Sequence, residues 1–342
     1  MTATDRAADL DAFLDAAGWA DATRAPLAGD ASLRRYVRLH GDRGPAIAMD
    51  APPGTGEDVR PFVRLARHLA DAGLSAPAIL AADEDRGFLL LEDLGDDLLA
   101  RVADRDPAAE PDLYAAAART LAAMQAAPAP GLPDYLPQMA PLAATITDWY
   151  APELAAMRDD VEGAMAEAVA DTLSDGAVMV HRDYHAENLL WLPGRDGAAA
   201  IGLLDFQDAM TGPAEYDLAS LIHDPRRTVA PNAAEAALAA WLATTGTDPD
   251  AARARIAVAS VQRSMRILGR VFTRLCLHSG RDGYLRFVPR TWEALTREVR
   301  HPALARLAPL VARLPAPDAA RIAAIRAHAG RFDGRDRAEP YA

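Results

Sequence analysis

Four apolar residues between positions 10 and 17 recur at the three- and four-residue spacing of a helix, and Gly18 follows them as a stop signal. Further along, apolar runs that are too short for helices and are bounded by glycine and proline indicate strands. The elements expected in this part are a helix over 10–17, strands over 36–39 and 46–49, an amphipathic helix over 57–72 and a buried strand over 88–91. The small and polar residues 28–33 predict a tight turn before the first strand.

From residue 107 onward, the spacing of apolar residues is mainly helical. The regions expected to be helical are 113–124, 142–170 and 216–331, and short strands are expected over 177–180, 189–191 and 200–204. A strand-rich first part and a mainly helical remainder indicate an α+β chain with two lobes. We place the two lobes at residues 1–95 and 96–342.

The composition is that of a globular protein, with 51% hydrophobic and 25% charged residues. A net charge of −13 argues against a nucleic-acid partner, because binding to phosphates needs concentrated positive charge. No apolar run approaches the ~20 residues of a membrane span, and the acidic N-terminus lacks the features of a secretory signal. Cys276 is the only cysteine, so an internal disulfide is impossible. We therefore expect a cytoplasmic protein that binds neither nucleic acid nor a membrane.

The most informative stretch is residues 180–191, in which a polar loop between two apolar strands holds Asp183 and Asn188. The next apolar strand ends at Asp205. Phosphoryl transfer from ATP needs a carboxylate that orients the acceptor hydroxyl and takes its proton, and it needs oxygen ligands that hold Mg²⁺. We therefore expect these three side chains to converge on one magnesium-loaded triphosphate.

The pattern His-x-Asp-x4-Asn, followed by Asp-Phe after the next strand, resembles the aminoglycoside phosphotransferase-like superfamily. The resemblance implies a bilobal, protein-kinase-like fold with ATP and Mg²⁺ as cofactors. It implies that Asp183 is the catalytic base and that Asn188 and Asp205 are metal ligands. It also implies that Glu92 and Leu94, which follow the buried strand, belong to a hinge whose backbone groups bind adenine.

Further motifs between about residues 10 and 300 resemble one group of this superfamily, the anomeric N-acetylmuramate/N-acetylglucosamine kinases of bacterial cell-wall recycling. They include Gly29–Tyr36, Met49–Pro53, Leu90–Gly95, Gln262-Arg263, Gly269–Leu275 and Gly283–Leu285. The resemblance implies ATP-dependent phosphorylation of the anomeric hydroxyl of an amino sugar to give the sugar 1-phosphate. Candidate contacts to this acceptor are His185, Asp208 and Arg263, of which Arg263 would meet the lactyl carboxylate of N-acetylmuramate.

The chain contains no lysine, since all 36 basic residues are arginine. Most kinase-like folds use a lysine on the third strand to bind the nucleotide phosphates. Arg34 and Arg35 follow the tight turn expected over the phosphate site, and a guanidinium group can bind phosphate through two parallel hydrogen bonds. We therefore expect arginine from this pair to take the place of the lysine at the nucleotide.

Three alternatives remain open for the function. The negative net charge also suits a kinase for a cationic acceptor such as an aminoglycoside, and the missing lysine also suits a non-catalytic nucleotide-binding protein. His181 and His185 flank Asp183 in a pattern that can bind zinc or manganese in a metallohydrolase. No matching histidine pair follows downstream, which disfavours the hydrolase.

Two sets of residues in the helical part have competing interpretations. Trp149 and Tyr150 either stack on a sugar ring or belong to the core, which is the commoner role of aromatic residues at this spacing. Arg263, Arg270 and Arg274 share one predicted helix, where a face exposed to solvent is the default expectation.

Overall fold

The computed structural model describes residues 3–27, 34–173 and 177–339. The chain divides into two compact units, residues 1–105 with 187–208, and residues 106–186 with 209–342. The turn expected at 28–33 lies outside the described residues. The lobe boundary after residue 95 stays a prediction, and residues 187–208 pack into the first unit although they lie far along the chain.

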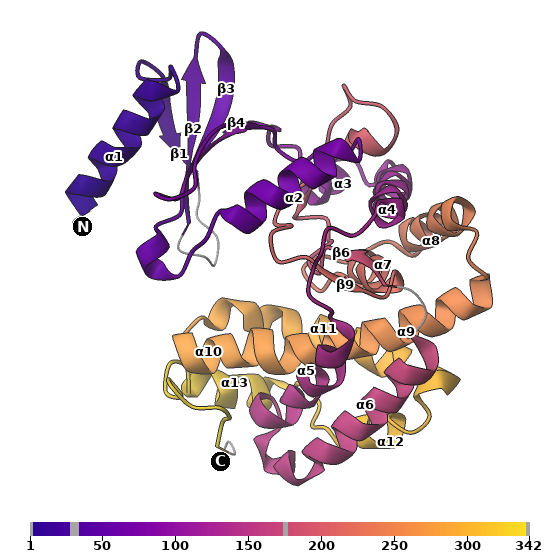
Figure 1. Ribbon diagram of the computed structural model, residues 1–342. Helices are drawn as coiled ribbons and strands as arrows, with labels where there is room; N and C mark the ends of the chain where they lie inside the picture. Colours follow the sequence, from indigo (N-terminus) through magenta and orange to yellow (C-terminus); the bar gives the residue numbers. More distant parts are fainter. Residues whose placement is uncertain (1–2, 28–33, 174–176, 340–342) are drawn as a thin grey trace. The chain divides into compact units, whose positions relative to one another are not determined.

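The first unit contains a five-stranded antiparallel sheet in the order β1-β2-β3-β5-β4. Its strands are β1 (Thr23–Pro26), β2 (Arg35–Gly41), β3 (Gly44–Asp50), β4 (Ile79–Asp83) and β5 (Phe88–Glu92). Helix α1 (Ala3–Ala16) lies beside this sheet (Figure 1) and ends before Gly18, whose φ is +78°. Phe13 of α1 stacks on Phe88 at 5.7 Å between ring centroids, so the helix and sheet share one apolar core.

Further elements of the first unit lie between strands β3 and β4 in the sequence or follow β5. They are η1 (Pro53–Thr55), α2 (Arg60–Asp71), α3 (Leu99–Arg105), β7 (Leu189–Trp191), η3 (Gly197–Ala200) and β8 (Ile201–Leu203). Strands β7 and β8 form an antiparallel pair, hereafter the β7–β8 hairpin, whose flanking residues are Asn188 and Asp205. The Leu203 N–H donates to the Ser75 carbonyl at 2.8 Å, which ties the hairpin to the segment after α2.

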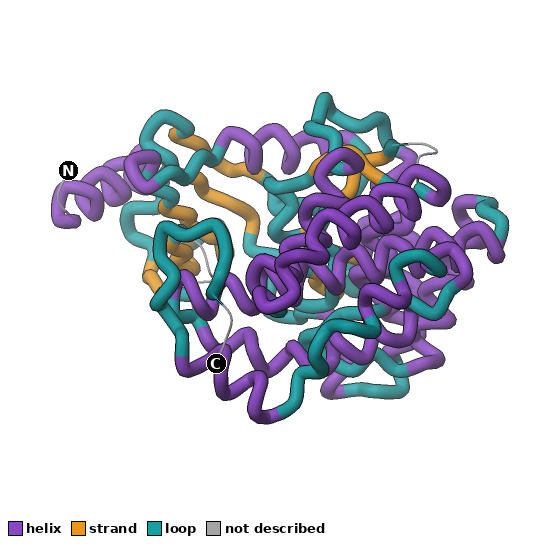
Figure 2. The backbone as a smooth tube through the Cα atoms, turned by 90° about the horizontal axis from the view of Figure 1, so that it is seen from below, coloured by secondary structure: helices purple, strands orange, loops and turns teal. Residues whose placement is uncertain are grey.

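Helices supply nearly all the regular structure of the second unit (Figure 2). They are α4 (Glu110–Ala126), α5 (Leu136–Trp149), η2 (Pro152–Met157), α6 (Arg158–Thr172), α7 (Glu215–Ile222), α8 (Pro231–Thr245), α9 (Pro249–Arg266), η4 (Ile267–Thr273), α10 (Arg274–Ser279), η5 (Asp282–Phe287), α11 (Val288–Glu298), η6 (Pro302–Leu304), α12 (Ala308–Val311) and α13 (Ala319–Ala327). Helix α4 packs on α8, and α9 packs on α5, α7 and α11. Strands β6 (Val178–Val180) and β9 (Met210–Gly212) form a separate antiparallel pair.

Helix α9 continues through η4 into α10, and η4 is a π-helix of seven residues. A Cβ atom on Gly269 would lie only 2.5 Å from the Thr145 carbonyl oxygen of α5. Glycine is therefore required at this position for the two helices to approach so closely. Cys276 is buried in α10.

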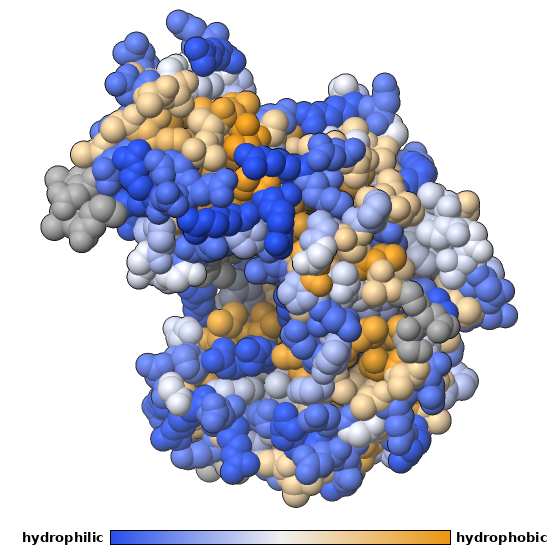
Figure 3. All heavy atoms as spheres, viewed as in Figure 1, coloured by the Kyte–Doolittle hydropathy of each residue, from blue (hydrophilic) through white to orange (hydrophobic). Residues whose placement is uncertain are grey.

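The predicted strands were found with small shifts of their ends. Helix α1 begins seven residues before the predicted start, and the predicted helical regions 142–170 and 216–331 each comprise several helices. Helix α3 and strands β1, β4 and β9 were not anticipated. Strand β1 is exposed along its length and contains Pro26, which removes the apolar alternation that marks a strand. Leu80 of β4 is 52% exposed, and it is the only large hydrophobic side chain classed as exposed among the described residues. On the face in Figure 3, hydrophilic residues are interspersed with the apolar ones. Within the described ranges, no helix is both long enough and apolar enough to cross a membrane.

Candidate active site

The β7–β8 hairpin brings Asn188 and Asp205 together. Leu189 and Leu203 are paired in its register, and the Leu204 N–H donates to the Asn188 carbonyl at 3.0 Å. Asp205 is exposed and has a φ of +60°, a backbone conformation that is costly for any residue with a side chain. Such a conformation persists only where the surrounding structure holds the residue in place, and it is common at functional sites.

Two neighbours of Asp205 fix its position. The buried Phe206 ring packs against Phe62 of α2 with 4.8 Å between centroids, and the Gln207 amide donates to Asp205 Oδ1 at 2.7 Å. The motif did not predict this role for Gln207, because an amide two residues from a carboxylate has no distinctive spacing. The contact orients one carboxylate oxygen and leaves the other, Oδ2, to coordinate a ligand.

A cavity of about 820 Å³ within the first unit is lined by both Asn188 and Asp205. This volume is in the range of small-molecule and cofactor sites. No group of three metal-binding side chains occurs in the described parts of the chain. An amide oxygen and a carboxylate nevertheless fit Mg²⁺ in a nucleotide complex, because phosphates and water supply the other oxygen ligands of such a site.

Arg34 lines the same cavity and forms an ion pair with Glu57, with 2.7 Å between Nε and Oε2. Burial alone would lower the pKa of the Arg34 guanidinium, but Glu57 and Tyr36 raise it, so the group stays charged. Tyr36, which also lines the cavity, has a pKa raised by burial and, in part, by the nearby Asp205 carboxylate. Arg35 is exposed and does not line this cavity.

Glu57 and Tyr36 were not anticipated as parts of the site. Their proximity arises from the pairing of β2 with β3 and from the turn before α2, neither of which leaves a motif in the sequence. The arrangement puts a half-buried cation and its carboxylate partner in the cavity that Asn188 and Asp205 also line.

The hinge segment, residues 92–97, lines the cavity through Glu92, Leu94 and their neighbours. The Glu92 N–H is already bound to the Ala78 carbonyl at 2.8 Å. The Leu94 N–H has no acceptor among the residues that the structure describes, so it can donate to a ligand. Arg38 of β2 fixes the segment from the sheet side through Asp93, at 2.6 Å, and Asp96, at 2.7 Å.

The loop that carries Asp183 belongs to the second unit and is held by Asp217. The fully buried Asp217 carboxylate accepts hydrogen bonds from the backbone N–H groups of His181, at 2.6 Å, and Arg182, at 2.9 Å. Burial raises the pKa of Asp217 to about 6, although these N–H groups oppose the shift. Asp217 therefore holds the backbone of this loop in place, including Arg182, whose φ is +75°.

Asp183 is partly exposed and lies in a strongly positive environment. Burial raises the pKa of its carboxyl, but the charges of Arg266, His185, Arg263 and Arg226 together outweigh this effect and lower the pKa to about 2. Arg263 is only 3% exposed, and its Nε and Nη2 atoms have no hydrogen-bond partner among the described residues. The expectation that this arginine faces solvent was wrong, because α9 is covered by α5, α7 and α11.

The remaining candidates have different environments. Asp208 is exposed on the first unit's cavity, whereas His185 of the second unit is 2% exposed and its pKa is lowered by burial. Trp149 and Tyr150 are both buried, and the Tyr150 hydroxyl donates to the Pro315 carbonyl at 2.8 Å. These two aromatic residues therefore belong to the core.

Comparisons with known proteins agree with the motifs. The profile of the phosphotransferase enzyme family matches residues 23–255. The N-acetylmuramate/N-acetylglucosamine kinase of Caulobacter vibrioides is 39% identical to this chain, covering 89% of it and 95% of the relative. The protein of the same name from Pseudomonas aeruginosa is 36% identical and covers 88% and 92% of the two chains.

A solved structure, a choline/ethanolamine kinase family protein from Mesorhizobium loti, superposes with a TM-score of 0.62 at 18% identity. It covers 95% of this chain and 99% of that chain, and it confirms the expected α+β, kinase-like fold. The profile match extends over more than half of the chain and includes Asp183, Asn188 and Asp205. The chain belongs to the phosphotransferase enzyme family.

Proposed function

We propose that this protein is an ATP-dependent kinase that phosphorylates the anomeric hydroxyl of N-acetylmuramate and N-acetylglucosamine to the sugar 1-phosphate. The observation that carries the proposal is the cavity that gathers Asn188, Asp205 and Arg34 in a chain 39% identical to a kinase of that name. Since ATP is the phosphoryl donor, the site of action is the cytoplasm. No nucleic acid or membrane takes part.

The first unit binds the nucleotide. When bound, magnesium ATP supplies the phosphoryl group, and the metal offsets the negative charge of the phosphates. Asn188 and Asp205 are the metal ligands. Arg34 provides the positive charge that a lysine supplies elsewhere, with Arg35 as a second candidate outside the cavity. The backbone at Glu92 and Leu94 binds adenine.

Asp183 orients the acceptor hydroxyl. It is five positions from Asn188, a stretch of chain that can span at most ~18 Å. With a pKa lowered to about 2 the carboxylate stays ionised, so it can accept a hydrogen bond from the hydroxyl and take up its proton. The hydroxyl proton passes to the Asp183 carboxylate late, as the new oxygen–phosphorus bond forms and the bond from the γ-phosphorus to the departing ADP breaks.

Arg263, His185 and Asp208 are the proposed acceptor contacts. The Arg263 N–H groups without a partner suit an anion, because a buried guanidinium is stable only when it is paired. N-acetylmuramate carries a carboxylate and N-acetylglucosamine does not. Arg263 is therefore expected to favour the acidic sugar.

An acceptor panel tests the function. The purified protein is mixed with magnesium ATP and, in turn, N-acetylmuramate, N-acetylglucosamine, an aminoglycoside or no acceptor, and release of ADP is followed. The proposal predicts ADP release with the amino sugars and a product that lacks a reducing end. Turnover of the aminoglycoside alone, or ATP binding without acceptor-dependent turnover, would refute it.

A further inference from the structure

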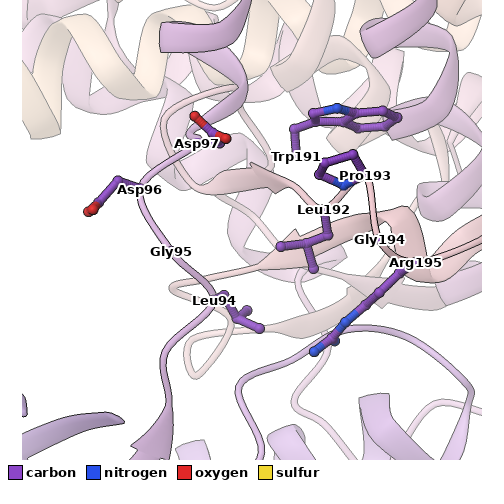
Figure 4. Close-up of a pocket in the computed structure, with 9 residues that line it drawn as sticks. All are labelled: Leu94, Gly95, Asp96, Asp97, Trp191, Leu192, Pro193, Gly194 and Arg195. Carbon is purple, nitrogen blue, oxygen red and sulfur yellow. The ribbon is translucent and has the colours of Figure 1, made fainter. Parts of the chain in front are cut away.

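The hinge segment is joined to the β7–β8 hairpin by backbone contacts within the first unit. The Trp191 N–H donates to the Asp97 carbonyl at 2.8 Å, and Leu98 and Leu190 form an antiparallel bridge. The two segments also line a smaller cavity of about 340 Å³, formed by residues 94–97 and 191–195 (Figure 4).

Gly202 of β8 allows the hinge segment to lie close to the hairpin. A Cβ atom on Gly202 would be 3.1 Å from Leu94 Cδ1 and 3.3 Å from Leu192 Cδ1. The Leu94 side chain therefore packs directly on the hairpin. A displacement of one segment must disturb the other, because packed side chains have little free space.

Arg195, in the loop between β7 and β8, adds a polar link between the same two segments. Its Nη2 pairs with the Glu92 carboxylate, and its Nη1 donates to the Ser75 hydroxyl at 2.8 Å. Figure 4 shows this side chain extended away from its loop. The Ser75 hydroxyl donates onward to the Ala199 carbonyl at 2.7 Å, so the link returns to the hairpin.

Glu92 is the last residue of β5 and the first of the hinge segment. Its other carboxylate oxygen accepts from the Ala78 N–H at 3.3 Å, next to the bond from the Glu92 N–H to the Ala78 carbonyl. The Glu92 side chain is thus held between the sheet and Arg195, and Arg195 is held between Glu92 and Ser75.

We propose that Arg195 is a positioning residue that couples the adenine end of the nucleotide site to its metal end. The inference rests on the proposed function, which assigns adenine to the hinge segment and Mg²⁺ to the hairpin. Arg195 touches neither ligand. It holds the hinge segment and the hairpin in one arrangement, so that binding at either end favours the geometry needed at the other, and this coupling is reciprocal.

The test measures binding rather than turnover. Dissociation constants of ATP are determined by calorimetry with and without Mg²⁺. The constant without Mg²⁺ divided by the constant with Mg²⁺, hereafter the Mg²⁺ ratio, reports how strongly the metal end contributes to affinity. Adenosine is titrated as a probe of the adenine end alone. For Arg195→Gln, we expect weaker adenosine binding and a fall of at least threefold in the Mg²⁺ ratio.

Two further variants sharpen the test. Arg105→Gln is the matched control, because Arg105 pairs with Asp97 of the same hinge segment at 2.5 Å but, within the described residues, forms no hydrogen bond or ion pair with the hairpin. It is expected to leave the ratio unchanged. Arg195→Lys is expected to restore part of the ratio, since an ammonium group can reach one of the two partners but cannot span both.

The pair Glu92→Gln and Arg195→Gln completes the experiment as a double-mutant cycle. If the two residues act through each other, the double variant is no worse than the more affected single variant. Additive effects, or a Mg²⁺ ratio in Arg195→Gln equal to that of the native protein, would overturn the inference. If the native protein binds neither ATP nor adenosine, it is the proposed function that fails.

Discussion

The two units surround their functional groups in opposite ways. In the first unit, Asn188, Asp205 and Arg34 line an open cavity, and Asp205 is exposed to solvent. In the second unit, Asp183 is partly covered, and Arg263 near it is almost wholly buried. An open site suits a ligand that must enter and leave in each catalytic cycle. A buried cluster of charges provides a fixed electrostatic environment, because charges interact more strongly in the low dielectric constant of a protein interior.

The largest effect is expected at Asp183. Replacing Asp183 by Asn should lower kcat by about 10²- to 10⁴-fold, since the side chain keeps its shape but can no longer take a proton. ATP affinity should be largely retained, because the nucleotide ligands belong to the other unit. Turnover assays and ATP titrations measure the two effects separately, and loss of both would instead indicate a folding defect.

The next effect is expected at Arg34. A charge-assisted hydrogen bond is worth about 1.5–3 kcal/mol, so Arg34→Ala should weaken ATP binding by roughly 10- to 100-fold. Adenosine, which has no phosphate, should bind nearly as before. Arg35→Ala is the matched control, because the two arginines are adjacent and only Arg34 lines the cavity. Equal losses of ATP affinity in both variants would contradict this assignment.

A smaller effect is expected at Asp217. An asparagine has one acceptor oxygen, so Asp217→Asn cannot hold the N–H groups of His181 and Arg182 as the carboxylate does. Leaving a buried N–H without a partner costs about 1–3 kcal/mol. Chemical denaturation should show this loss of stability, and kcat should fall while ATP affinity does not. A change confined to ATP affinity would contradict the role given to Asp217.

The last effect concerns stability alone and develops only in acid. Burial lowers the pKa of His223 to about 4, and its Nδ1 lies 2.8 Å from the Ser260 hydroxyl. Between pH 6.5 and 4, the unfolded chain takes up a proton that the folded chain does not, so acid removes stability in this window. In His223→Gln, the decline of unfolding free energy over this range should be shallower by about 2 kcal/mol. Denaturation midpoints at several pH values measure it, and parallel curves for the two proteins would exclude His223.

Local patterns were enough to predict that Asn188 and Asp205 lie close together at one hairpin. Asn188 and Asp205 flank short strands, and strand pairing brings the ends of a hairpin together whatever surrounds it. The fold class followed from the change between strand-like and helix-like spacing. Both are properties of residues that lie near one another in the sequence.

Contacts between segments that lie far apart in the sequence could not be predicted from local patterns. The pairing of Arg34 with Glu57 depends on where the turn before α2 ends, and the burial of Arg263 depends on three helices that cover α9. A charged residue on a helix is exposed in most proteins, so the pattern favoured the wrong environment for Arg263. The burial of Arg263 can therefore be recognised only from the tertiary structure.

The backbone at Asp205 has an evolutionary consequence. A glycine would relieve the left-handed conformation there, worth about 1 kcal/mol or more, while removing a carboxylate from the cavity. Asp205→Gly is therefore a change that selection for heat resistance alone would reward and that selection for growth would reject. A library sorted only by thermal survival should accumulate this variant, which the proposed function expects to be inactive.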